Sequence, residues 1–98
     1  MENKTLTAGD PNFEFSVGTI IQPLNWEVAF LVDNIGLVTM KLQKNVESDR
    51  RKPAIWKDTD SSDVITTNGT TVFRVVGGGY FRLLTVGTPV SVFVSLSF

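Results

Sequence analysis

Three consecutive glycines, Gly77 to Gly79, lie between two apolar runs, and each run contains an arginine, Arg74 or Arg82. Glycine-rich turns that open a helix can bind phosphate through free backbone amides. A Walker loop ends in Gly-Lys-Ser/Thr before a helix, however, and the dinucleotide fingerprint also needs a helix after its glycines. The residues after Gly79 alternate as in a strand instead. The glycines therefore predict a turn or a bulge between two strands.

Arg74 and Arg82 each lie in the middle of a strand-like run, and the short connection is expected to bring them onto neighbouring strands. Like charges directly opposite each other repel, so one interpretation places the arginines on the solvent face and offset from each other. The other interpretation pairs them with carboxylates of another subunit, because the planar guanidinium suits interfacial ion pairs.

A run of oxygen-bearing side chains, Asp58-Thr59-Asp60-Ser61-Ser62-Asp63, places oxygens at alternate positions as a calcium loop does. The sixth position holds Asp63 instead of glycine, and the twelfth holds Gly69 instead of glutamate, so a solvated turn is favoured. Paired carboxylates could hydrolyse glycosides, but we expect no cleft that would raise the pKa of a general acid. We therefore expect no catalytic residues, no metal, no cofactor and no enzymatic activity.

The 98 residues contain neither cysteine nor histidine, which excludes disulfides, Cys/His zinc sites, thiol nucleophiles and histidine bases. The net charge is −1, and the basic cluster at 50–52 is flanked by Glu47 and Asp49, so nucleic acid is not an expected partner. The N-terminal segment is polar, and no apolar run approaches the roughly 20 residues of a membrane helix. We expect one domain, 1–98, made in the cytoplasm and not associated with a membrane.

Apolar and polar residues alternate over most of the chain, which is typical of half-buried β-strands. The last segment places on one face Val90, Val92, Val94, Leu96 and Phe98, and on the other Ser91, Ser95 and Ser97. The same alternation predicts inward faces formed by Phe13, Phe15 and Val17, by Trp26, Val28, Phe30 and Val32, and by Val38, Met40 and Leu42. In a further strand, Phe81, Leu83 and Thr85 face away from Tyr80, Arg82, Leu84 and Val86.

Turn residues separate these strands. The segment from Asp33 to Gly36 predicts a tight hairpin, and Asn68-Gly69 predicts a two-residue type I′ hairpin. Residues 45–62 break the alternation and predict a long connection or an irregular edge segment with at most one helical turn. Seven or eight short strands at this spacing predict an all-β fold, an antiparallel β-sandwich that is jelly-roll-like, with a small β-barrel as the alternative.

Four features follow one another between Ile55 and Phe98: Trp56-Lys57-Asp58, Asn68-Gly69, Gly77-Gly78-Gly79-Tyr80 with Arg82, and the alternating Val/Ser strand. In this order they resemble small virion proteins of tailed bacteriophages, which decorate capsids or form head and tail attachments. Phe81 separates Tyr80 from Arg82, whereas the two residue types are usually adjacent in that pattern. The resemblance implies a structural protein of the virion that docks on coat protein or another virion protein.

The terminal strand also predicts an association surface. Phe93 interrupts its serine face, so an edge strand at this position would be apolar on both faces and would aggregate unless covered. A symmetric homo-oligomer such as a trimer, or a coat-protein lattice, would cover it; alternatively, Phe93 lies under the 45–62 connection. The predicted interaction surface consists of Phe93, Arg74, Arg82, Trp56 and Tyr80.

The aromatic residues Trp26, Trp56 and Tyr80 indicate a different class of function. Aromatic rings stack on sugars, and small β-sandwiches often present such rings. The alternation assigns Trp26 to the core, whereas Trp56 lies in a polar segment. A carbohydrate-binding module is therefore the alternative to a virion protein.

Overall fold

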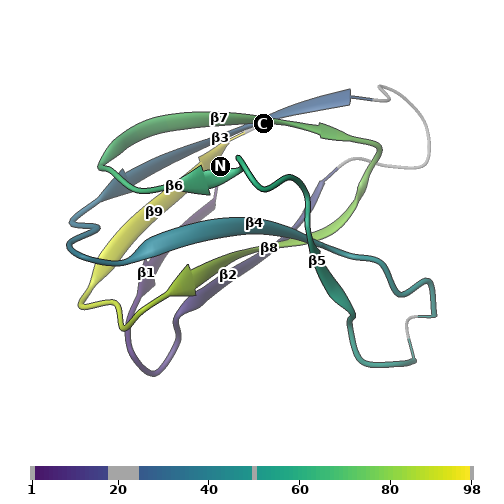
Figure 1. Ribbon diagram of the computed structural model, residues 1–98, viewed down its shortest axis with the longest axis horizontal. Helices are drawn as coiled ribbons and strands as arrows, with labels where there is room; N and C mark the ends of the chain where they lie inside the picture. Colours follow the sequence, from purple (N-terminus) through teal and green to yellow (C-terminus); the bar gives the residue numbers. More distant parts are fainter. Residues whose placement is uncertain (1, 18–24, 50, 98) are drawn as a thin grey trace.

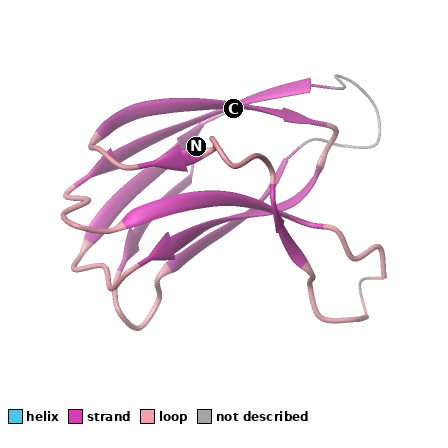
Figure 2. Cartoon of the chain, viewed as in Figure 1, coloured by secondary structure: helices cyan, strands magenta, loops and turns pink. Residues whose placement is uncertain are grey.

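The computed structural model describes residues 2–17, 25–49 and 51–97. These residues form nine strands and no helix, arranged as two antiparallel sheets packed face to face (Figures 1 and 2). The predicted β-sandwich is confirmed, with nine strands in place of seven or eight. The strands are β1 Glu2–Leu6, β2 Asn12–Val17, β3 Asn25–Asp33, β4 Thr39–Asn45, β5 Trp56–Asp58, β6 Val64–Ile65, β7 Gly69–Val76, β8 Gly79–Val86 and β9 Val92–Ser97. Within the described residues there is no helix that could cross a membrane.

The strand order is that of a jelly roll. The first sheet has the order β1-β9-β3-β7, and the second has the order β2-β8-β4-β5, with β6 also paired to β4. Early strands pair with late ones in a nested series: β1 with β9, β2 with β8, β3 with β7, and β4 with β5 and β6. Successive pairs alternate between the two sheets, which confirms the jelly-roll-like arrangement predicted from the sequence.

The core lies between the sheets and is formed by the inward faces that the alternation predicted. Its largest members are five buried phenylalanines: Phe13, Phe15, Phe30, Phe73 and Phe81. The ring centroid of Phe15 in the second sheet lies 5.5 Å from that of Phe30 in the first sheet, in an edge-to-face contact. Phe15 also stacks on Phe81 at 5.8 Å. Aromatic pairs at these separations attract each other beyond their apolar burial, so they help to hold the sheets together.

Two predicted hairpins are wrong, although three of their turn residues, Asn34, Gly36 and Gly69, have positive φ. Asn34 and Gly36 both have φ of 63°, yet they connect β3 of the first sheet to β4 of the second. Gly69 has φ of 110° and begins β7 in the first sheet, whereas the preceding strand β6 belongs to the second sheet. Asn68 does not adopt the positive φ of a type I′ turn. In a jelly roll most consecutive strands lie in opposite sheets, so these turns change sheets.

The three glycines form the turn that the sequence predicted, but this turn also changes sheets. Gly77 and Gly79 have φ of 72° and 153° between β7 in the first sheet and β8 in the second. A Cβ at Gly79 would lie 3.1 Å from Cε of Lys44, so the turn is also closely packed. The expectation that Arg74 and Arg82 lie on neighbouring strands is therefore wrong.

The C-terminal strand β9 lies inside the first sheet, between β1 and β3. Its predicted inward residues are fully buried: Val92, Val94 and Leu96. Val90 is 80% exposed because the strand starts only after Ser91, which has φ of 59°, and Phe98 lies outside the described residues. The prediction of an edge strand here is wrong because β1, which sequence reasoning missed, covers that edge. Its only buried apolar residue is Leu6, so β1 has no clear alternation.

Candidate binding surface

Trp56, Tyr80 and Arg82 form an aromatic–arginine cluster on the outer face of the second sheet. Trp56 comes from β5 and the other two from β8, so their side chains meet across β4, which lies between these strands. The ring centroids of Trp56 and Tyr80 are 5.4 Å apart with an interplanar angle of 42°. Cζ of Arg82 lies 4.7 Å from the Trp56 ring centroid, a favourable cation–π geometry. Three of the five predicted interaction residues are thus in contact.

A row of polar residues holds this cluster in place. Glu14, Arg82, Gln43 and Asp58 follow one another in register across β2, β8, β4 and β5. Nε of Arg82 donates to Oε1 of Gln43 at 2.8 Å, and Nε2 of Gln43 donates to Oδ1 of Asp58 at 2.8 Å. Because Gln43 binds both neighbours, it fixes the guanidinium above the indole ring. Sequence reasoning missed Gln43 and Glu14, which appear there only as polar members of the alternation.

Glu14 also fixes the third member of the cluster. The Tyr80 hydroxyl donates to Oε2 of Glu14 at 2.8 Å. This hydrogen bond, together with burial and the negative charge of Glu14, raises the pKa of Tyr80 above its ordinary value of 10.0. Tyr80 therefore remains a neutral donor at physiological pH, beside the cation of Arg82.

Asn45 sets the register that places Trp56. Its Oδ1 accepts hydrogen bonds from the backbone N–H groups of Glu47 at 2.9 Å and Ile55 at 3.0 Å, one at each end of the connection between β4 and β5. The backbone N–H of Val46 also donates to the carbonyl of Ile55 at 2.8 Å. Asn45 thereby pairs with Trp56 across the two strands. The edge segment predicted within 45–62 is confirmed as β5, and asparagine just before the break in alternation was the available signal.

Arg74 and Phe93, the other two predicted residues, lie on the outer face of the first sheet. Nη2 of Arg74 is 3.3 Å from Oε1 of Glu27 on β3, and the two side chains are 71% and 67% exposed. Within this chain, Arg74 therefore lies on the solvent face and pairs with Glu27. Phe93 is 38% exposed and lies opposite Thr5 of β1 and Asp33 of β3. The 45–62 connection cannot cover it, because β5 of that segment belongs to the second sheet.

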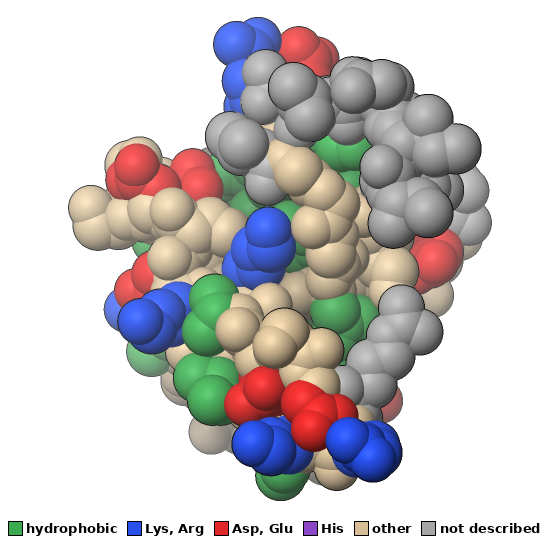
Figure 3. Space-filling view, turned by 90° about the vertical axis from the view of Figure 1, so that its right-hand side faces the viewer, with side chains coloured by type: hydrophobic (Ala, Val, Ile, Leu, Met, Phe, Trp, Pro, Cys, Tyr) green, Lys and Arg blue, Asp and Glu red, His purple; other side chains and the backbone are tan. Residues whose placement is uncertain are grey.

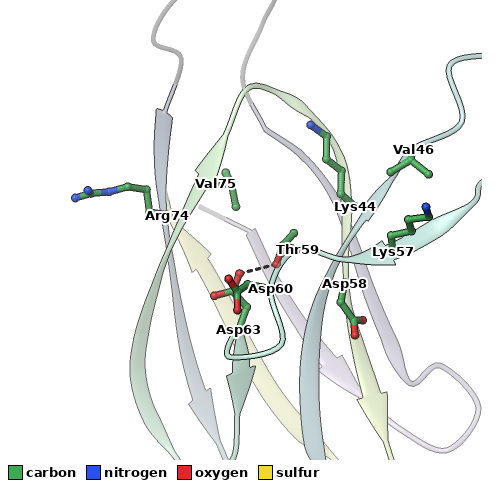
Figure 4. A pocket seen from close by; sticks show the side chains of 9 residues that line it. All are labelled: Lys44, Val46, Lys57, Asp58, Thr59, Asp60, Asp63, Arg74 and Val75. Carbon is green, nitrogen blue, oxygen red and sulfur yellow. Dashed lines mark hydrogen bonds between the residues drawn. The ribbon is translucent and has the colours of Figure 1, made fainter.

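A cavity of about 460 Å³ lies between β7 and the β4–β5 side of the second sheet (Figure 4). It is lined by Lys44, Val46, Lys57, Asp58, Thr59, Asp60, Asp63, Arg74 and Val75. Oδ1 of Asp60 accepts from the backbone N–H and the hydroxyl of Ser62, both at 2.9 Å, which confirms the predicted turn. These bonds lower the pKa of Asp60, so it is ionised at neutral pH and unsuited to act as a general acid.

The charges around this side of the molecule are mixed. Figure 3 shows acidic and basic side chains interspersed with apolar and uncharged ones on the right-hand side of Figure 1. Within the residues that the structure describes, no group of three or more His, Cys, Asp or Glu side chains is placed to hold a metal ion.

Comparison with known proteins gave no match to a protein family, to a curated protein or to a solved structure. Function is therefore argued from the geometry of the aromatic–arginine cluster and from the sequence pattern around it. That pattern supplied Trp56, Tyr80 and Arg82, and the fold brings them together.

Proposed function

We propose that this chain is a non-enzymatic structural protein of a phage particle, a capsid decoration or head–tail attachment component that self-associates and docks on coat protein. One observation carries the proposal. Two parts of the virion-protein pattern that are far apart in sequence, Trp56 and the pair Tyr80 and Arg82, are in contact on one exposed sheet face. A pattern whose separate parts converge at one surface supports a shared binding role for them.

The composition of the cluster supports docking on another protein. Tryptophan, tyrosine and arginine are the residue types enriched at the energetic centres of protein interfaces. Arg82 and Tyr80 are held by Gln43 and Glu14, so little side-chain entropy is lost when a partner binds. The cluster is therefore preorganised for a flat partner surface.

Self-association is assigned to the opposite sheet. The outer face of the first sheet exposes Leu31, Val72 and Phe93 on its strands β3, β7 and β9. Homo-oligomers commonly bury such apolar side chains between copies. The two contacts therefore use different faces of the sandwich, and one copy can make both.

The proposal is tested on particles of a phage that encodes the chain. We expect the chain in purified particles at a fixed ratio to coat protein, and we expect the purified chain to bind particles that lack it. Arg82→Ala and Trp56→Ala should weaken that binding by at least about tenfold, as loss of an interface centre does. The matched control is Arg51→Ala, because the Arg51 side chain is 90% exposed in the β4–β5 connection and makes none of the contacts of the cluster.

Two results would contradict the docking proposal. One is the absence of the chain from purified particles. The other is equal binding by the Arg82→Ala and Arg51→Ala variants, each shown by circular dichroism to keep the wild-type fold.

Carbohydrate binding is the second candidate, favoured by the neighbouring rings of Trp56 and Tyr80. Trp26 does not contribute to it, because this residue packs against the core as predicted. The guanidinium of Arg82 covers one face of the Trp56 ring, which leaves a sugar only the opposite face. Binding on a glycan array that is lost in Trp56→Ala would favour this function; an array without binding would exclude the glycans presented.

A further inference from the structure

The open edges of the two sheets differ in how they are protected. In the described residues, the edge strands of the first sheet are β1 and β7, and those of the second are β2 and β5. An edge strand carries free backbone N–H and C=O groups that can pair with another chain. Natural proteins block such edges with short strands, inward-pointing charges or covering segments.

The side formed by β1 and β2 is closed. Lys4 of β1 points towards the second sheet, where its Nζ donates to the carbonyl of Asn12 in β2 at 2.6 Å and to Oδ1 of Asp10 at 2.9 Å. Paired backbone bonds of 3.1 Å between Thr7 and Asp10 tighten the connection between the two strands. An inward lysine and a tight connection therefore protect these two edges.

The opposite side is protected only in the second sheet. There β5 has three residues and β6 has two, which are too short to template another strand. In the first sheet, β7 has eight residues, and among the described residues its only paired neighbour is β3. The cavity lined by Val75 separates β7 from β5, so the second sheet does not cover this edge.

The sequence of β7, GTTVFRVV, includes none of the protective devices. It contains no proline, and its inward residues Phe73 and Val75 are buried and apolar. Val72 is 56% exposed on the outer face, beside the single charge of the strand, Arg74. The rest is almost entirely β-branched, the composition that pairs best with another strand.

We propose that β7 pairs antiparallel with β7 of a second copy of this chain, with Val72 opposite Val72, and joins the two first sheets into one continuous sheet. The contact deepens the self-association part of the proposed function and rests on it. It uses the edge of the first sheet, and of the exposed outer-face residues it brings only Val72 into the contact. In this register Arg74 lies opposite Thr70 of the other copy, and Phe73 lies opposite Thr71. Residues opposite each other then lie on the same face of the joined sheet, so the outward side chains of both copies are on one face and the inward ones on the other.

Charge disfavours one of the other possible registers. A shift that placed Arg74 opposite Arg74 of the other copy would set two like charges face to face, which is unfavourable. With Val72 at the twofold axis, each arginine faces a threonine, and β-branched residues pair at the centre. A second copy therefore provides a strand that fits β7 in both shape and charge.

The first test measures oligomeric state by analytical ultracentrifugation over a range of concentrations. We expect the wild-type chain to dimerise and Val72→Lys to raise the dissociation constant by roughly tenfold or more, because two introduced lysines would face each other. Val86→Lys is the control, since Val86 is 46% exposed on β8 of the other sheet and should leave the dimer intact. Mixing Val72→Lys with Val72→Glu should restore dimers.

The second test uses the absence of cysteine from the sequence, which makes every introduced thiol unique. Residues opposite each other in an antiparallel pair have Cα atoms about 4.5–5.5 Å apart, within reach of a disulfide. Val72→Cys should therefore form a covalent dimer on mild oxidation. Arg74→Cys alone should not, because its copies would be roughly 13 Å apart along the strands, but it should cross-link when mixed with Thr70→Cys.

Different results of these tests would contradict the β7 contact and the proposed self-association. If the wild-type chain dimerises but Val72→Lys dimerises equally well, or Arg74→Cys cross-links alone, the β7 contact is wrong and self-association uses another surface. If the wild-type chain is monomeric at every concentration, both the contact and the proposed self-association are wrong. Docking through Trp56 and Arg82 is measured separately on particles and is unaffected by either result.

Discussion

The two arginines of the glycine-rich segment have different roles because their neighbours differ. Arg82 lies on the indole ring of Trp56 and donates from Nε to Gln43, so both its flat face and one of its donors are used. Arg74 meets only an exposed carboxylate, that of Glu27, and such surface pairs contribute about 0–1 kcal/mol. The side chain that organises a surface is therefore Arg82.

A prediction at the residue scale concerns the titration of Tyr80. Glu14→Ala removes the hydrogen bond and the charge that raise the pKa of Tyr80, so this pKa should fall towards 10.0. The chain has a single tyrosine, so the tyrosinate absorbance band reports Tyr80 alone. Glu27→Ala, on the other sheet, is the control and should leave the midpoint unchanged. Equal midpoints in wild type and Glu14→Ala would show that the hydrogen bond does not control the titration.

The same interaction sets a direction for stability against pH. Because the folded-state pKa of Tyr80 is raised, its contribution to stability is fully present below the ordinary pKa of 10.0. The contribution is lost as the pH rises through the folded-state pKa. Wild type should therefore lose stability relative to Glu14→Ala only in that alkaline range, and chemical unfolding at neutral and alkaline pH would measure the difference.

Sequence alone identified the residue types of the cluster but not its geometry. Trp56 is conspicuous as an aromatic residue in a polar segment, and Tyr80 as the aromatic residue of the Gly77-Gly78-Gly79-Tyr80 motif. That Trp56 reaches Tyr80 across β4 depends on the register that Asn45 sets. Glu14 and Gln43 resemble any other outward polar residue until their cross-strand partners are known.

At the element scale, the alternation predicted which way the strands face but not which strands pair. Val92 and Val94 are buried, as predicted, and Phe81 and Leu83 share one buried face, as their spacing predicted, because the two-residue period is local. Partner choice depends on contacts far apart in sequence, so turn residues such as Asn34 and Gly36 can have positive φ without forming a hairpin. Such turns report a change of direction only.

A prediction at this scale compares the two faces of β9. Leu96 is fully buried and Phe93 is 38% exposed on the other face. Leu96→Ala should lower the free energy of unfolding by about 2–5 kcal/mol through loss of core packing. Phe93→Ser should lower it by at most about 1 kcal/mol, the range of strand propensity. Urea unfolding would measure both, and a larger loss for Phe93→Ser would reverse the assignment of the faces.

At the scale of the whole molecule, the jelly roll separates two surfaces. The aromatic–arginine cluster lies on the outer face of the second sheet, and the open edge of β7 belongs to the first. A partner bound at one surface therefore leaves the other accessible. Such a sandwich can join copies to one another while each copy remains attached to a larger surface.

The nested pairing also controls how the chain folds. The innermost pair, β4 with β5, closes a short loop, whereas the outermost pair joins Glu2 to Leu96. Because long loops close last and at the greatest entropic cost, the pairs should form from the inside outwards, and slowly for a chain of this length. The outermost pair is also the first to open in the native state, since β1 contributes only Leu6 to the core.

Amide hydrogen exchange would detect this opening. We expect the amides of β1 to exchange well before those of β3, which is paired on both sides. Equal protection of the β1 and β3 amides from exchange would contradict the expectation that the outermost pair opens first. While β1 is detached, β9 becomes an open edge strand that carries the partly exposed Phe93, so aggregation should start from this rare state of the monomer.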